Sequence, residues 1–295
     1  MAADSGSPRG LLDQPVGFIG LGQIGAPMAR RLLDWPGGLV VGDVRHQAVE
    51  PFAAAGARVV NSAGEVVAAG ARLIGVMVLD DTQVHRVVGE IIEAAPPGTI
   101  VAIHSTIRPD TAVGLAAAAS DVGIEVLDAP VSGGSVGAQE GTLALLVGGD
   151  EAAVESARPV FDRYADLVRR FGPAGMGTRA KIARNLISFA GFAAAGEAQR
   201  LAEAAGVDLR AMARVVRHSD AITGGVGSIL LRDTTAPMAA DDPLFAVLSH
   251  TRDLGEKDLN LAVEMAGELG VELPMGQAAL ASLARGLGVA PAADG

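Results

Sequence analysis

Short apolar runs alternate with Ala-rich helical stretches along the first half of the chain. The runs are rich in Val, Ile and Leu, and they are VGFIG, GLVVGD, ARVV, RLIGVMVL, TIVAIHS, IEVLDAP, LALLVGG and LVRRFG. Helical stretches begin near Ala26, Ala48, Ala63, Thr82, Asp110 and Glu151. Strands that alternate with helices of this size predict βαβ units and a mostly parallel sheet over residues 15–174.

Only helical periodicity continues after about Thr178. It predicts helices over 178–205, 208–218, 226–232, 243–270 and 274–286, with Asp208 and Thr251 as possible N-terminal caps and Gly206, Gly270 and Gly288 as stops. The pattern therefore predicts an α/β domain at residues 15–174 and an all-α domain at 175–290. Residues 1–14 are small and polar, do not resemble a signal peptide, and are expected to form a flexible tail.

Composition and charge exclude several classes of function. The 295 residues include no cysteine, which removes disulfides, thiol nucleophiles and thiolate metal sites. The net charge of −11 and the lack of a long basic run argue against nucleic acid and anionic membranes as partners. The five histidines are scattered, so no metal site is expected. We expect a soluble, cytoplasmic protein.

A glycine-rich loop follows the first predicted strand. Gly20, Gly22 and Gly25, with Leu21, Gln23 and Ile24 between them, form a G-x-G-x-x-G that precedes a helix. This context is typical of a Rossmann dinucleotide-binding domain, in which the glycines allow a tight turn, backbone approach to a pyrophosphate and close packing of the helix. Asp43 ends the second strand, where a carboxylate accepts hydrogen bonds from the adenosine ribose and favours NAD over NADP. Arg45 nearby weakens that preference.

A cation lies at the start of the first long helix of the all-α domain. Lys181 follows the glycine-rich joint Gly172–Gly177, and Asn185 lies one turn later on the same face. The helix dipole, Arg179 and Arg184 would disfavour the ammonium form, which favours proton transfer near neutral pH. The alternative is a solvated surface lysine.

Two further candidates follow predicted strands. In DAPVSGG, Ser132, Gly133 and Gly134 offer a hydroxyl and backbone N–H groups to an anion, although the same residues would make an ordinary turn. His104 has no G-x-S-x-G motif beside it, so we expect it to be structural or adjacent to the cofactor.

Five motifs in order carry a family resemblance: GFIGLGQIGAPMA, HSTIRP, DAPVSGG, GMGTRAKIARN and EKDLNLA. The chain resembles the β-hydroxyacid dehydrogenase family, which includes 3-hydroxyisobutyrate dehydrogenases and tartronate semialdehyde reductases. The resemblance implies an NAD(P)-dependent oxidoreductase that interconverts a small β-hydroxy acid and its semialdehyde or keto form. It also implies a homodimer or homotetramer that packs through the long helix.

The resemblance assigns roles to individual positions. Lys181 matches the general acid/base, and Asn185 matches a substrate-contacting asparagine. The other matches are a carboxylate-binding group at Ser132, Gly133 and Gly134, and cofactor contacts at Val78, Leu79, Thr106 and Lys257. Three positions depart from the family: Arg184 replaces an asparagine, His250 an aromatic residue, and Asp80 a proline.

Two other functions fit the fingerprint. One is an imine reductase, a class that usually lacks the lysine matched by Lys181. The other is a non-catalytic dinucleotide-binding module, which would also have lost that lysine.

Overall fold

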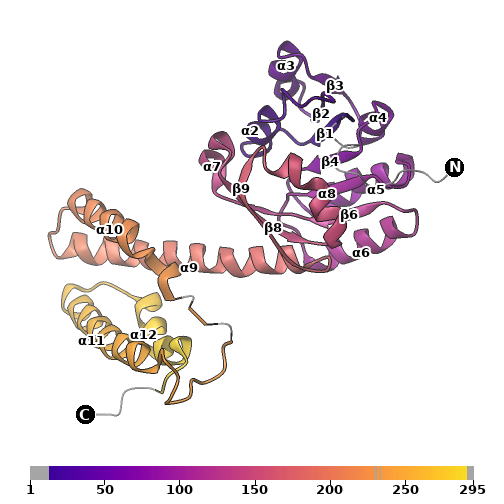
Figure 1. The fold of residues 1–295 in the computed structure, drawn as a ribbon. Helices are drawn as coiled ribbons and strands as arrows, with labels where there is room; N and C mark the ends of the chain where they lie inside the picture. The colour runs from indigo at the N-terminus through magenta and orange to yellow at the C-terminus, as the bar shows by residue number, and fades with distance from the viewer. Residues whose placement is uncertain (1–12, 230, 233, 291–295) are drawn as a thin grey trace. The chain divides into compact units, whose positions relative to one another are not determined.

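The computed structural model describes residues 13–229, 231–232 and 234–290, so most of the tail expected at 1–14 lies outside the described residues. Residue contacts divide the chain into two compact units, Met1–Arg184 and Asn185–Gly295 (Figure 1). The first unit is an α/β domain and the second is helical, which confirms the predicted fold class.

The first unit is built on one nine-stranded sheet. Its strand order is β3-β2-β1-β4-β5-β6-β8-β7, with β9 paired to β8. Strands β1 to β6 pair in parallel, whereas β8 runs antiparallel to β6 and β7. The order of the first six strands is that of a dinucleotide-binding Rossmann fold. The strands are β1 (Val16–Ile19), β2 (Leu39–Gly42), β3 (Arg58–Val60), β4 (Leu73–Val76), β5 (Ile100–Ile103), β6 (Glu125–Asp128), β7 (Val131–Ser132), β8 (Leu143–Gly148) and β9 (Ala165–Gly172).

Helices connect these strands and include one that the sequence did not predict. Helix α7 and strand β7 are short and rich in glycine and serine, so they carry no clear apolar periodicity. The helices are α2 (Gly25–Arg30), α3 (His46–Ala54), α4 (Ala63–Ala68), α5 (Asp81–Ala94), α6 (Pro109–Ser120), α7 (Gly134–Glu140) and α8 (Glu151–Phe161).

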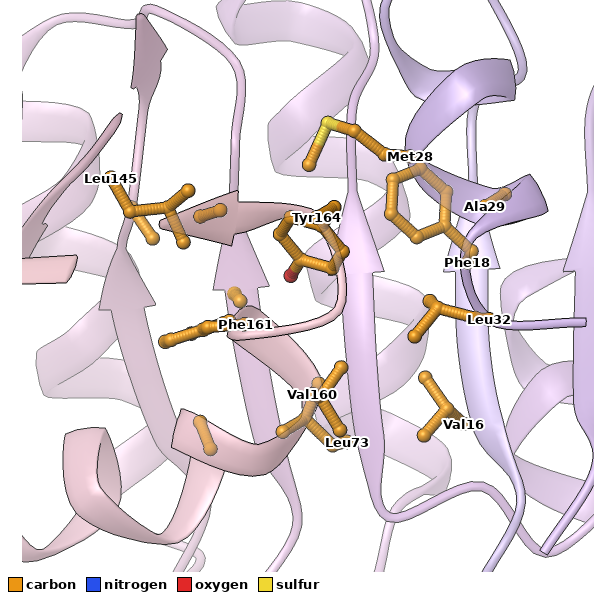
Figure 2. Packing of buried hydrophobic residues seen from close by; sticks show 14 of the residues in the cluster. Val16, Phe18, Met28, Ala29, Leu32, Leu73, Leu145, Val160, Phe161 and Tyr164 are labelled. Atoms are coloured by element: carbon orange, nitrogen blue, oxygen red, sulfur yellow. The ribbon is translucent and has the colours of Figure 1, made fainter. Parts of the chain in front are cut away.

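Apolar cores cover both faces of the sheet. Figure 2 shows one of them, in which Phe18 of β1 and Met28 of α2 belong to the same cluster as Phe161 of α8. The next residue of β1, Ile19, faces the opposite core with side chains from α4, α5 and α6. Because neighbouring residues of a strand point to opposite faces, burial on both sides requires the near-continuous apolar runs seen in the sequence.

The second unit contains the larger part of α9 and helices α10 to α12. Helix α9 (Met176–Ala204) begins in the first unit and continues into the second, followed by α10 (Leu209–Thr223), a 3-10 helix (Gly225–Ile229), α11 (Phe245–Leu269) and α12 (Pro274–Leu287). Asp208 caps α10 as expected, accepting hydrogen bonds from two backbone N–H groups. The cap expected at Thr251 is wrong, because this residue lies inside α11 and its hydroxyl donates to the Val247 carbonyl.

A buried carboxylate fixes the start of α12. The two oxygens of Glu197 in α9 accept hydrogen bonds from the N–H groups of Met275 at 2.8 Å and Gly276 at 3.0 Å. The carboxylate thereby satisfies two N–H groups that lack a partner within their own helix. Across the described parts of the chain, no helix is long and apolar enough to cross a membrane.

Candidate functional site

The candidate cofactor segments leave the sheet at one edge. Ile19, Val76, Ile103 and Asp128 are register partners that end four adjacent parallel strands. The glycine loop follows the first of these strands, Val78 and Leu79 the second, and Thr106 the third. Open parallel sheets bind ligands beyond the carboxyl ends of their strands, where the strand order reverses. Here that reversal falls between β1 and β4.

The glycine loop is tightly packed at its first and third glycines and open at the second. Gly20 has φ +95°, and a Cβ there would lie 2.2 Å from the Met77 carbonyl oxygen. A Cβ on Gly25 would lie 2.0 Å from the Gly20 carbonyl oxygen, whereas one on Gly22 would meet no atom within 4 Å. The backbone is open at Gly22, and the next residue, Gln23, is exposed. A pyrophosphate could therefore approach the loop closely at this point.

Asp43 is the acidic residue that directly follows β2, and neighbouring groups of the same chain hold its carboxylate. Its side chain is only 6% exposed and accepts a hydrogen bond from the Leu21 N–H at 2.7 Å. Arg45 donates through both its backbone and its guanidinium. Burial alone would raise the pKa of Asp43, but these hydrogen bonds outweigh burial and lower the pKa below its usual value.

The loop after β4 is anchored by a serine. The Ser105 hydroxyl donates to the Val78 carbonyl at 2.7 Å and receives a hydrogen bond from the Val78 N–H at 2.9 Å. Leu79 is 82% exposed, and Thr106 is also exposed. Asp80, one of the departures from the family pattern, is the N-cap of α5, with its carboxylate accepting from the Gln83 N–H at 2.9 Å. This helix therefore uses a side-chain cap where the family often has proline.

The DAPVSGG segment begins with the last residue of β6, includes the whole of β7 and ends at the first residue of α7. Ser132 pairs with Ala144 of β8, and its side chain is half-buried. Gly133 and Gly134 are exposed and have φ values of +130° and +64°, conformations that favour glycine. Both residues lie at the surface of the first unit, where an anion can approach their backbone.

A buried aspartate fixes the beginning of α9. Asp128, at the end of β6, accepts hydrogen bonds from the N–H groups of Gly175 at 2.7 Å and Thr178 at 2.6 Å. A Cβ on Gly177 would lie 2.5 Å from the Asp128 carbonyl oxygen, so the helix backbone packs directly against the strand end. Asp128 thus attaches the first turn of α9 to the edge where the cofactor segments emerge.

Lys181 follows on the next turn of α9, and its environment makes the amine easier to deprotonate than that of an ordinary lysine. Lys181 as a whole is only 8% exposed. Burial, and to a lesser degree the cation of Arg184, lower the pKa of Lys181 to about 8. Arg179, which the sequence placed among the groups acting on this lysine, lies against the Met176 sulfur instead. An amine with this pKa can accept and return a proton near neutral pH.

Asn185, His250 and Lys257 belong to the second unit. Asn185 is half-buried in α9, four residues after Lys181. His250 and Lys257 lie on α11, both exposed, and the Lys257 amine is 3.0 Å from the Asp258 carboxylate.

His104 has a structural environment. Its ring is buried, with Nδ1 2.8 Å from the Ala129 carbonyl oxygen and Nε2 3.2 Å from the Tyr164 hydroxyl. Burial lowers its pKa to about 4, so the ring is neutral and part of the core that includes Phe18. Within the described ranges, no group of three His, Asp or Glu side chains is placed to hold a metal ion.

Sequence reasoning missed three contributors to the site. They are Asp128 as the anchor of α9, Ser105 as the anchor of the Val78 loop, and the direct contact of Arg45 with Asp43. The only sequence signal for Asp128 was its place at the end of a strand within DAPVSGG, because its partners lie 47 and 50 residues away.

Comparisons with known proteins cover nearly the whole chain. A family model described as the NAD binding domain of 6-phosphogluconate dehydrogenase matches residues 15–172. A second model, described as the NAD-binding domain of NADP-dependent 3-hydroxyisobutyrate dehydrogenase, matches residues 175–292.

Individual relatives agree with these matches. An uncharacterised oxidoreductase of Mycobacterium tuberculosis is 51% identical over 98% of this chain and 96% of its own. An NAD-dependent L-serine dehydrogenase of Pseudomonas aeruginosa is 36% identical over 90% of this chain and 89% of its own. The crystal structure of an oxidoreductase from Mycobacterium avium 104 has a TM-score of 0.89 and 49% identity, covering 94% of this chain and 99% of that one.

Proposed function

The chain belongs to the β-hydroxyacid dehydrogenase family, and on that premise we propose that it interconverts a small β-hydroxy acid and its semialdehyde or keto form. The oxidised form of NAD or NADP, bound by the first unit, accepts the hydride in oxidation, and the reduced form donates it in reduction. The relative named L-serine dehydrogenase supports the substrate class, because L-serine is itself a β-hydroxy acid.

The burial of the Lys181 residue, with the lowered pKa of its amine, is the observation that carries the proposal. The chain contains only two lysines among its 23 Lys and Arg residues, so a lysine is not its ordinary surface cation. Both lysines, Lys181 and Lys257, fall within the motifs of the family resemblance. Lys181 is also nearly buried and has a pKa lowered to about 8, whereas a solvated surface lysine would be exposed and fully charged.

Each remaining candidate has a role in this proposal. Lys181 takes the proton from the substrate hydroxyl in oxidation and returns it in reduction. The backbone N–H groups at Gly133 and Gly134, with the Ser132 hydroxyl, hold the substrate carboxylate. Asn185 orients the reacting oxygen or the Lys181 amine, and Lys257 helps to close the site.

A spectrophotometric screen for NADH or NADPH formation tests the proposal. The substrates are 3-hydroxyisobutyrate, 3-hydroxypropionate, glycerate, 4-hydroxybutyrate and L-serine, each with NAD and with NADP. We expect turnover of at least one, and a loss of about 100-fold or more in Lys181→Ala, the usual range for removing a general acid or base. Arg200→Ala, an exposed cation of the same helix, is the matched control.

The outcomes separate the competing functions. Full turnover by Lys181→Ala would remove the lysine from the mechanism and favour an imine reductase, which cyclic imines with NADPH would reveal directly. Cofactor binding without turnover of hydroxy acids or imines would favour the non-catalytic module. Turnover that disappears only in the Lys181 variant supports the dehydrogenase.

We also propose that the protein works as a homo-oligomer that packs through α9. In the second unit, Leu186, Phe189 and Phe192 of this helix are 70%, 63% and 68% exposed. Large apolar side chains grouped in this way mark interaction surfaces. Light scattering after size-exclusion chromatography should give a dimer or tetramer, and Phe189→Asp should shift it to monomer. A wild-type monomer at micromolar concentration would contradict this part of the proposal.

A further inference from the structure

Donors from its own chain occupy every acceptor position of the Asp43 carboxylate. Oδ1 accepts from the Arg45 backbone N–H at 2.8 Å and from Arg45 Nε at 3.0 Å. Oδ2 accepts from the Leu21 N–H at 2.7 Å and from Arg45 Nη2 at 3.1 Å. A carboxylate offers about four such positions. A ribose hydroxyl could therefore bind Asp43 only by displacing a donor.

The displaceable donor is the guanidinium of Arg45. The two backbone donors are fixed by the turn after β2 and by the glycine loop, whereas the Arg45 side chain is 60% exposed. Its Nη2 also donates to the Leu21 carbonyl at 3.1 Å, so the guanidinium bridges Asp43 and the glycine loop. The arginine therefore lies where a Rossmann domain receives the ribose of the adenosine half.

The same guanidinium retains free donors. Nε and Nη2 bind Asp43 and Leu21, but among the described residues Nη1 has no hydrogen-bond partner. A phosphate on the 2′-oxygen carries its own acceptors and negative charge, which match an arginine held in this position. The negative charge of Asp43, which would repel that phosphate, is neutralised by the same arginine.

We propose that Arg45, and not Asp43, is the specificity-determining residue of the cofactor site, and that it favours NADP over NAD. In the Arg45–Asp43 pair, the Nη1 of Arg45, which has no partner in the described part of the chain, offers N–H donors to a 2′-phosphate, and the guanidinium competes with the ribose hydroxyls for the Asp43 carboxylate. A preference for NADP is the reverse of the one expected from Asp43 alone. The proposal rests on dinucleotide binding by the first unit and is independent of the hydroxy-acid substrate proposed above.

Calorimetric titration with adenosine fragments tests this site without substrate or nicotinamide. The probes are 2′,5′-ADP and 5′-AMP, which differ only in the 2′-phosphate, at one fixed ionic strength. We expect the wild-type protein to bind 2′,5′-ADP about tenfold or more tightly than 5′-AMP, as a charge-assisted contact to phosphate allows. In Arg45→Ala and Arg45→Gln this ratio should fall to about one or below.

Arg58→Ala removes an exposed arginine from the neighbouring strand β3 and should leave the ratio unchanged. Tighter binding of 5′-AMP by the wild type, or an unchanged ratio in both Arg45 variants, would overturn the proposal. Binding of neither nucleotide would overturn it together with the cofactor assignment. The expected nucleotide pattern in a protein that oxidises no hydroxy acid would uphold Arg45 and refute only the proposed reaction.

Discussion

The protonation of Lys181 gives the sharpest prediction about the candidate site. Burial and the cation of Arg184 together lower its pKa from 10.5 to about 8. The substitution Arg184→Gln removes the cation and keeps a polar side chain of similar length. Because a nearby positive charge disfavours an ammonium ion, we expect the pKa of Lys181 to rise in this variant while staying below 10.5, since the burial remains.

The magnitude follows from the fraction of neutral amine. At pH 7 a pKa of about 8 leaves about 9% of the lysine neutral, against about 0.03% at 10.5, a difference of about 300-fold. Burial is the larger of the two causes, so Arg184 accounts for less than half of the change in pKa. Its removal should therefore lower the neutral fraction at pH 7 by at most about 16-fold.

Chemical labelling measures this pKa without any substrate. The chain has only two lysines, so acetylation with trace acetic anhydride at a series of pH values, followed by peptide mass spectrometry, separates Lys181 from the exposed Lys257. Only the neutral amine reacts, so the pH midpoint for Lys181 reports its pKa. Lys257 in the same sample serves as the internal reference, and Arg200→Gln is the matched control variant.

The rates of turnover should follow the same protonation. In the proposed mechanism oxidation needs the neutral amine of Lys181, so kcat/KM in that direction should rise with pH to a plateau above about 8, and kcat/KM for reduction should fall over the same range. In Arg184→Gln both midpoints should move to higher pH. A labelling midpoint that stays in place would refute the electrostatic role of Arg184. A uniform loss of rate with unchanged midpoints would also refute it and would favour a substrate contact for Arg184 instead.

Three further predictions concern stability and the cofactor loop. Gly22→Ala should change the free energy of unfolding by less than about 0.5 kcal/mol yet weaken dinucleotide binding, whereas Gly25→Ala should lower the free energy of unfolding by about 1–3 kcal/mol because its Cβ meets a backbone oxygen. Calorimetry measures the binding and urea denaturation the stability, and equal effects of the two variants would contradict the loop geometry. Asp128→Asn should lower the free energy of unfolding by about 1.5–3 kcal/mol through loss of a charge-assisted bond to α9, and an unchanged urea midpoint would show that the anchor is dispensable. Glu197→Gln should cost about 1 kcal/mol by weakening the cap of α12, with circular dichroism in urea as the measurement and the exposed Glu203→Gln as the control that should cost nothing.

The Asp43 and Arg45 pair shows where inference from sequence stops. The position of Asp43 at the end of β2 followed from the strand pattern and the spacing to the glycine loop. Whether its carboxylate faces the solvent or is bound by a neighbour depends on side-chain rotamers and on the approach of Leu21, 22 residues earlier. A rule based on residue type therefore predicted the position of the candidate site but left its charge pattern undetermined.

The sequence by itself determined the elements and their order. Short apolar runs, helical periodicity and the G-x-G-x-x-G context are local properties, so they predicted the Rossmann domain, the helical domain and the positions of the candidate residues. The sequence did not predict β7 and α7, because these short elements show no apolar periodicity. The tertiary structure alone decided which carboxylate holds α9, how deeply Lys181 is buried and which donors fill Asp43. These features depend on contacts between residues far apart in the chain, and burial and hydrogen bonding, more than residue type, set the chemistry of an ionisable group.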